Sequence, residues 1–450
     1  MRTLIENGNI VNEGKCFKAN ILIEDDKIFT ITNKSIRKNS TYDHYIDAKG
    51  SFILPGIIDT HVHFREPGLE EKADIESESR AAAYGGVTSF FDMPNTIPQT
   101  ITIKALQDKY NRAKLKSHIN YTFFFGATSN NSDTIKQLDI HSVPGVKLFM
   151  GASTGNMLVD ERSALDNIFE SVANKGLILM THCEDSAMIN KNMIDAKKIH
   201  GADPNIIYHD IIRSEAACYK SSSLAVELSL KHKTQLHIAH ITTARELSLL
   251  NKPNVRDFVT LEAVIAHLIF TNKDYKTIGS LIKCNPAVKS ITDRTELRKA
   301  LADGRISTIG TDHAPHLISQ KQGGCSCAAS GMPIIQFSLV CMLELVDKGV
   351  ITLEQLVNLM AHTPSKRFNI DNRGYLREGY KADIVIVTPN KQWTVTKDII
   401  QSKCKWSPLI GHIFNWKVEH TFCNGIHLYN NGVFNENYRG EKLSFRSNIR

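Results

Sequence analysis

The chain has 450 residues, a formal net charge of +7 and a hydrophobic fraction of 42%. This composition indicates a globular protein with a sizeable core, and it excludes a disordered chain. No apolar run approaches the ~20 residues that cross a membrane, and the N-terminus lacks the apolar segment of a signal peptide.

The 54 basic residues are scattered among 47 acidic ones, which favours a solvated basic surface over a nucleic-acid groove. The nine cysteines show no zinc-finger spacing and indicate reduced thiols. We therefore expect a cytoplasmic protein that binds neither nucleic acid nor membrane.

The two ends of the chain share a strand-and-turn pattern. Short apolar stretches at 3–8, 19–24 and 26–31 predict strands, and similar stretches return at 382–387 and 418–429, the latter with an Asn-Gly turn at 424–425. We predict that residues 1–51 and 372–450 form one small β-sandwich domain.

Between these ends, eight apolar runs alternate with helix-like stretches, a pattern typical of a parallel sheet with helical crossovers. The runs are 53–60, 87–93, 120–126, 145–150, 177–182, 235–240, 258–264 and 306–312. Residues 52–371 are thus predicted to form a (β/α)8 TIM barrel, within an overall α/β fold. In such a barrel the functional side chains lie at the C-terminal ends of the strands.

The first run ends in a metal-binding type of pattern. His61, His63 and Arg65 alternate along an extended chain and so project to one side, about 7 Å apart. The pattern fits a pair of metal ligands beside a cation. By itself it fits equally well a polar strand end whose histidines are only hydrogen-bonded.

The fourth and fifth runs carry further candidates. Lys147 lies inside the apolar sequence 146–150, where a lysine is costly to bury unless it is neutral, paired or bound to a metal. A snorkelling edge lysine is the alternative. The fifth run ends at His182.

The sixth run contains two histidines three residues apart, which cannot share one face of a regular strand. We expect His240, nearer the strand end, to point inward and His237 to be packed. The eighth run ends at Asp312, which suits a metal ligand or, alternatively, a cap of the next helix.

Taken together, these residues have the chemistry of a site for two metal ions. Two divalent ions need an anionic bridge, and a neutral buried lysine can supply one by adding carbon dioxide to become a carbamate. One ion would then bind His61, His63 and Asp312, and the other His182 and His240. Such a site activates a shared water and polarises a carbonyl, and imidazole and oxygen ligands suit zinc.

The same residues carry a family resemblance. The stretches 59–68, 81–88 and 92–96, followed by 145–151, 181–184, 240–243 and 310–316, resemble the cyclic amidohydrolases and are most similar to the dihydroorotases. The resemblance covers nearly the whole chain, including the terminal β segments.

The resemblance implies two Zn²⁺ per subunit, bridged by carbamylated Lys147 and a hydroxide, with Asp312 as both ligand and catalytic proton shuttle. It also implies substrate contacts from Arg65, Asn95, Asn285 and His316. The implied reaction is the reversible interconversion of (S)-dihydroorotate and N-carbamoyl-L-aspartate in pyrimidine (UMP) biosynthesis. A homodimer and an association with aspartate transcarbamoylase are compatible with the resemblance.

Related enzymes that cleave allantoin, dihydropyrimidines or hydantoins share the metal pattern, so substrate choice depends on Arg65. Enzymes for neutral rings have no substrate carboxylate to hold and usually lack this arginine. A non-catalytic scaffold is the alternative from another class, but such proteins typically lose metal ligands, whereas all six candidates are present here.

Two stretches depart from the dihydroorotase pattern. Residues 287–289 read Ala-Val-Lys after Asn285-Pro286, which weakens the case for Asn285. The glycine-bearing stretch 323–333 fits either a loop that closes over the site or a plain mobile connector.

Overall fold

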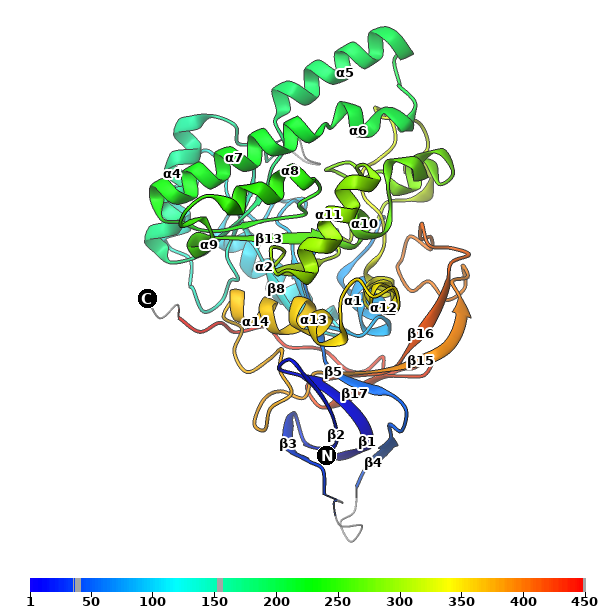
Figure 1. The fold of residues 1–450 in the computed structure, drawn as a ribbon. Helices are drawn as coiled ribbons and strands as arrows, with labels where there is room; N and C mark the ends of the chain where they lie inside the picture. The colour runs from blue at the N-terminus through cyan, green and yellow to red at the C-terminus, as the bar shows by residue number, and fades with distance from the viewer. Residues whose placement is uncertain (35, 37–41, 152–156, 448–450) are drawn as a thin grey trace.

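The computed structural model describes residues 1–34, 36, 42–151 and 157–447, and at its centre is a ring of parallel strands (Figure 1). Two parallel sheets make the ring, in the orders β14-β13-β12-β11-β10-β9 and β6-β7-β8. Only Phe124 separates β8 from β9, and Val62 pairs with His313 where the ring closes. The strands are β6 (Ile57–Val62), β7 (Val87–Asp92), β8 (Asn120–Phe123), β9 (Phe125–Gly126), β10 (Val146–Phe149), β11 (Ile178–His182), β12 (Gln235–Ile238), β13 (Val259–Val264) and β14 (Thr308–Gly310).

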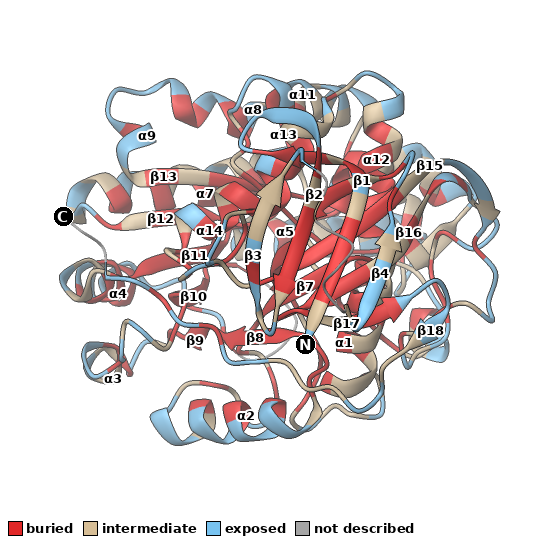
Figure 2. Ribbon diagram, turned by 90° about the horizontal axis from the view of Figure 1, so that it is seen from below, coloured by how far each residue is buried: buried red, intermediate tan, exposed pale blue. Residues whose placement is uncertain are grey.

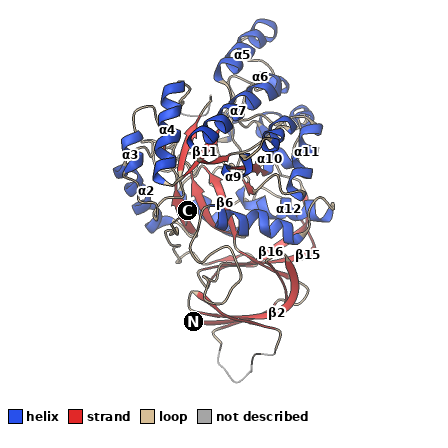
Figure 3. Ribbon diagram, turned by 60° about the vertical axis from the view of Figure 1, so that its left-hand side comes forward, coloured by secondary structure: helices blue, strands red, loops and turns tan. Residues whose placement is uncertain are grey.

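Helices surround this ring (Figure 3). They are α1 (Ile75–Tyr84), α2 (Ile103–Lys116), α3 (Ser132–Lys136), α4 (Arg162–Lys175), α5 (Ser186–His200), α6 (His209–Ile212), α7 (Glu215–His232), α8 (Ala244–Leu247), α9 (Val255–Phe258), α10 (Ile265–Ile269), α11 (Ile291–Ala302), α12 (Ser338–Asp347), α13 (Leu353–Val357) and α14 (Thr363–Arg367). Further short helical segments, of 3-10 or π type, are η1 (Ile206–Tyr208), η2 (Ser248–Asn251), η3 (Asn272–Lys276), η4 (Gly279–Ile282), η5 (Ile318–Lys321), η6 (Ile335–Phe337) and η7 (Asn358–His362).

Helix α1 shows why the sequence forms these elements. Asp74 caps its first turn by accepting a hydrogen bond from the Ser77 backbone N–H at 2.8 Å. Its alanines at 81–83 are fully buried and allow close packing on the barrel. The strands are buried on both faces, which is why they read as apolar runs rather than as alternating patterns.

Strands from both ends of the chain make a separate mixed sheet, as the sequence predicts. Its order is β18-β17-β16-β15-β5-β1-β2-β3, with β4 paired to β1. Figure 2 shows exposed β4 at one edge and buried residues of β2 within the sheet. The strands are β1 (Arg2–Asn12), β2 (Lys15–Glu24), β3 (Lys27–Thr32), β4 (His44–Asp47), β5 (Phe52–Pro55), β15 (Ile384–Thr394), β16 (Ile413–Cys423), β17 (Ile426–Asn430) and β18 (Val433–Phe434).

The prediction of one strand at 53–60 was wrong in detail, because this run serves both sheets. β5 pairs with β1 and β15 in the terminal sheet, whereas β6 pairs with β7 in the barrel. Gly56 joins them, and a Cβ there would lie 2.2 Å from the Thr88 hydroxyl oxygen. Glycine therefore lets the chain pass closely over β7 as it changes sheets. The predicted fold class, an α/β barrel with a terminal β domain, is confirmed.

Candidate functional site

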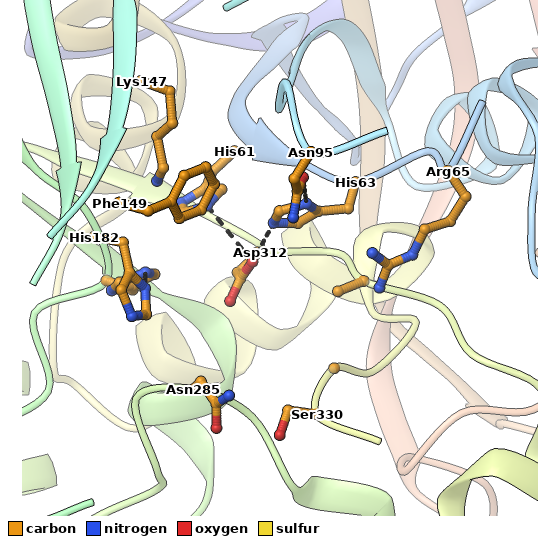
Figure 4. A pocket seen from close by; sticks show the side chains of 13 residues that line it. His61, His63, Arg65, Asn95, Lys147, Phe149, His182, Asn285, Asp312 and Ser330 are labelled. Carbon is orange, nitrogen blue, oxygen red and sulfur yellow. Dashed lines mark hydrogen bonds and ion pairs between the residues drawn. The ribbon is translucent and has the colours of Figure 1, made fainter. Parts of the chain in front are cut away.

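The candidate residues converge at one end of the barrel, where they line a single cavity (Figure 4). His61, Lys147 and His182 belong to β6, β10 and β11, while His240 and Asp312 follow β12 and β14. Strands that are far apart in sequence thus bring their ends to one place, as a barrel requires. The predicted residues that line the cavity are His61, His63, Arg65, Asn95, Lys147, His182, His240, Asn285 and Asp312.

Three of these residues form a compact group of metal-type donors. Asp312 Oδ1 lies 3.1 Å from His63 Nε2 and 3.5 Å from His61 Nε2. Although burial alone would raise it, the two histidines hold the pKa of Asp312 well below its usual value, so the carboxylate is ionised. Burial lowers the pKa of His63 to about 4, although Asp312 opposes this shift, so the buried imidazole gives up its proton readily to a cation.

The far nitrogen of each imidazole is held by a second side chain. His61 Nδ1 lies 2.7 Å from Glu262 Oε1, and His63 Nδ1 lies 2.8 Å from Asn95 Oδ1. Because these oxygens accept the Nδ1 protons, the Nε2 atoms of both rings face Asp312. Partners of this kind orient histidine ligands and fix their tautomers.

His182 and His240 form the second pair of donors. His182 Nδ1 lies 3.0 Å from His240 Nε2, and burial lowers the pKa of both rings. His182 Nε2 lies 3.2 Å from the buried carboxylate of Glu184, which is also paired with Arg213. Although burial would raise it, Arg213 then lowers the pKa of Glu184 to about 2.

Lys147 is the unpartnered member of the group. Its side chain is fully buried, and its Nζ has no hydrogen-bond partner within the described part of the chain. Burial lowers the pKa of Lys147 to about 8. Burying an ammonium without a partner is unfavourable in free energy. Carbamylation and metal binding would remove this penalty.

Three residues at this rim have left-handed backbone conformations. The φ angles are 69° at Arg65, 39° at His240 and 49° at Asp312. Such φ angles are unfavourable for residues other than glycine. Strained backbone conformations of this kind cluster at functional sites, where they orient side chains.

The cavity also contains polar groups suited to a small polar ligand. Arg65 is buried; its Nε donates to the Pro315 carbonyl at 3.0 Å, and its Nη2 lies 3.1 Å from His316 Nε2. Burial lowers the pKa of Arg65 to about 10, which leaves it charged at neutral pH. Asn285 Oδ1 is buried without a hydrogen-bond partner among the described residues.

Sequence reasoning missed two carboxylates that orient the histidines. Glu262 lies within β13 and Glu184 follows β11, and both are fully buried. The sequence did contain a signal for Glu262. It is a charged residue inside the apolar run 258–264, and burying a charge in such a run is costly, which is the argument that identified Lys147. The histidine of the sixth run that does not line the cavity, His237, packs with its Nδ1 2.8 Å from the Thr260 hydroxyl.

A second group of metal-type donors lies elsewhere, at Glu76, His118 and Glu436. The Arg80 guanidinium already binds both carboxylates, at 3.4 Å from Glu76 and 2.8 Å from Glu436. Because an arginine supplies the positive charge there, we assign no metal to this group.

The chain belongs to the Amidohydrolase family, which matches residues 52–426. It is 32% identical over 390 residues to a dihydroorotase of Methanosphaera stadtmanae, covering 87% of this chain and 88% of that one. It is also 31% identical over 434 residues to an allantoinase of Bacillus velezensis, covering 95% and 94%.

Among solved structures, an L-hydantoinase (dihydropyrimidinase) from Arthrobacter aurescens matches with a TM-score of 0.92 and 26% identity over 99% of both chains. Across the described residues, no helix is both long and apolar enough to span a membrane.

Proposed function

We propose that this protein is a dihydroorotase, which interconverts (S)-dihydroorotate and N-carbamoyl-L-aspartate. One observation carries the choice of substrate. Arg65 is a buried cation at the cavity wall, and no carboxylate of the described residues lies within ion-pair distance of it. A buried guanidinium without an anionic partner predicts a ligand that brings one, and a carboxylate can bind it bidentately.

The donor set fits two metal ions. His61, His63 and Asp312 would hold one ion, His182 and His240 the other, and carbamylated Lys147 would bridge them. The unpartnered Nζ of Lys147 and the lowered pKa values of the His63, His182 and His240 imidazoles support this assignment. Two Zn²⁺ would polarise the ring carbonyl and lower the pKa of water at the site.

The residues of the chain then have separate tasks in hydrolysis. Arg65 and His316 hold the substrate carboxylate, and Asn95 and Asn285 satisfy polar edges of the ring. Ionised Asp312 takes a proton from the attacking water as the C–O bond forms. It returns this proton to the ring nitrogen as the C–N bond breaks. The reverse sequence closes N-carbamoyl-L-aspartate to dihydroorotate.

A hydantoinase or allantoinase is the second candidate, favoured by a hollow that adjoins the cavity. The hollow has a volume of about 760 Å³, shares Arg65 and Asn95 with the cavity, and presents Leu69, Ile97 and Ile101. It could receive an apolar substituent of a hydantoin, which dihydroorotate lacks.

Metal-replete protein assayed side by side on dihydroorotate, allantoin and a substituted hydantoin tests the proposal. We expect turnover of dihydroorotate, and a fall of at least about thirtyfold in kcat/KM for Arg65→Met, since truncating one partner of a buried charge pair costs about 2 kcal/mol or more. Lys72→Met, which removes a charge beside the same hollow, is the matched control.

Turnover of allantoin or the hydantoin without turnover of dihydroorotate would favour the second candidate. An Arg65→Met variant with unchanged kcat/KM for dihydroorotate would refute the role of Arg65.

A further inference from the structure

The segment 323–331 has no helix or strand, yet it forms part of the cavity wall. Its last residues, Ser330 and Gly331, line the cavity beside Arg65 and Asp312. The sequence left open whether the stretch 323–333, which contains this segment, is a loop that closes over the site or a mobile connector. Its hydrogen bonds indicate a third possibility, a wall held in one conformation.

Two buried lysines bind the carbonyl groups of the segment. Lys321 Nζ donates to the carbonyls of Ala329 at 2.7 Å, Gly331 at 2.8 Å and Lys283 at 3.1 Å. Lys283 Nζ in turn donates to the carbonyls of Cys325, at 2.8 Å, and Ala328. Each ammonium thus uses its N–H donors on backbone oxygens.

Neither lysine has an acidic partner. Lys321 is fully buried and Lys283 is 3% exposed, and over the described ranges no carboxylate lies within ion-pair distance of either Nζ. Burial lowers the pKa of Lys321 to about 7 and that of Lys283 to about 8, and the carbonyl dipoles of the segment stabilise the protonated forms. The segment and the two lysines therefore stabilise one another.

A single carboxylate binds the N–H groups of the same segment. Asp203, between α5 and η1, accepts from the backbone N–H groups of Gly324 at 2.7 Å, Ser326 at 2.8 Å and Cys327 at 3.1 Å. Side chains from outside the segment thus bind both its N–H groups and its carbonyl groups.

The segment in turn contacts the corner of the cavity that contains Arg65. The Ser330 carbonyl lies 3.0 Å from His316 Nε2, which lies 3.1 Å from Arg65 Nη2. A Cβ at Gly331 would lie 2.5 Å from the Ala314 carbonyl, so the backbone packs directly on the loop that bears His316. Trp406 adds support, since its Nε1 donates to the His316 carbonyl at 2.7 Å and its ring faces the Lys321 ammonium.

We propose that Lys283 and Lys321 are positioning residues that hold the segment 323–331 as a rigid wall and thereby fix His316 and Arg65 for binding an anionic substrate. Neither lysine touches the reacting atoms. The part of this inference that concerns substrate rests on the proposed function. The rigidity of the segment does not.

The test compares Lys321→Met and Lys283→Met with the parent protein in two measurements. The first is amide hydrogen exchange of peptides that cover 323–331, which needs no substrate. The second is KM and kcat for dihydroorotate on metal-replete protein. The control is Lys381→Met, because Lys381 pairs with Asp26 and Glu441 beside the terminal sheet and does not line the cavity.

We expect faster exchange confined to 323–331 and the loops that touch it, and a rise in KM of about tenfold or more with a smaller change in kcat, since hydrogen bonds to charged groups are strong. A general loss of stability would instead lower kcat and would not be confined to this segment. The Lys381→Met control shows what replacing a lysine elsewhere in the chain does to both measurements. Asp203→Asn weakens the hydrogen bonds to the N–H groups of the same segment, so it should also give faster exchange in 323–331 and a raised KM. This variant tests the inference if a lysine variant fails to fold.

Unchanged exchange in the segment would overturn the inference, and so would an unchanged KM in variants whose segment has become mobile. If the parent protein does not turn over dihydroorotate, the proposed function fails while the exchange data still decide whether the lysines hold the wall.

Discussion

Replacing Glu262 by glutamine should weaken metal binding without unfolding the barrel. Its carboxylate lies 2.7 Å from His61 Nδ1 and accepts hydrogen bonds from the Thr60 hydroxyl at 3.1 Å and the His240 backbone N–H at 3.2 Å. It therefore orients one candidate ligand through its ring and another through its backbone. Glutamine keeps the shape but brings two N–H donors to a place where all three neighbours donate.

The size of the effect follows from these contacts. Loss of a partner that orients a histidine ligand typically costs 10- to 100-fold in metal affinity, or about 1.4–2.7 kcal/mol. We expect this range for the ion at His61, His63 and Asp312. The assay is competition for Zn²⁺ between the protein and a chromophoric chelator, with metal content measured after dialysis.

Glu246→Gln is the matched control for this variant. Glu246 is also a buried carboxylate beside the barrel, but its oxygens accept from Ser222, Thr242 and Thr243, none of which is a candidate ligand. Zinc affinity should be unchanged in this control. Equal affinities in the Glu262→Gln variant and the parent protein would refute the orienting role of Glu262.

Two further predictions concern other buried groups. Lys147→Met should abolish activity yet stabilise the metal-free protein by about 1 kcal/mol or more, because it removes a buried polar atom without a partner; a lower Tm than that of the metal-free parent would contradict this. Burial raises the pKa of Cys183 and Cys284 to about 12, so these thiols stay protonated at pH 8, and alkylation of the native protein should be concentrated at exposed Cys16 and Cys327. Mass spectrometry of the labelled protein checks this, and rapid labelling of Cys183 or Cys284 without denaturant would count against it.

The barrel could be read from the sequence because its strands are buried on both faces and appear as apolar runs. Where a run is interrupted, the sequence was less informative. The run at 120–126 is divided at Phe124, a buried ring that packs against Phe91 and Phe368. Such a break depends on packing between residues far apart in the chain, which a local pattern does not contain.

The candidate site was predictable for a related reason. His61 and His182 stand at or next to the ends of their strands and Lys147 lies within β10, and a barrel brings the ends of its strands to one rim. The partners that orient them were harder to find, because Glu262 is recognisable only as a misplaced charge until its contact with His61 is seen. The wall at 323–331 could not be predicted, since its stability depends on Lys283 and Asp203 from other parts of the chain.

The terminal sheet has a consequence for synthesis of the chain. β5 leads directly into the barrel, yet its antiparallel partner β15 begins only at Ile384. A nascent chain must therefore carry β5 with one edge unpaired while most of the barrel is made. Early termination before β15 would leave that edge open for good, so truncated chains should aggregate even though every residue that lines the cavity has already been made.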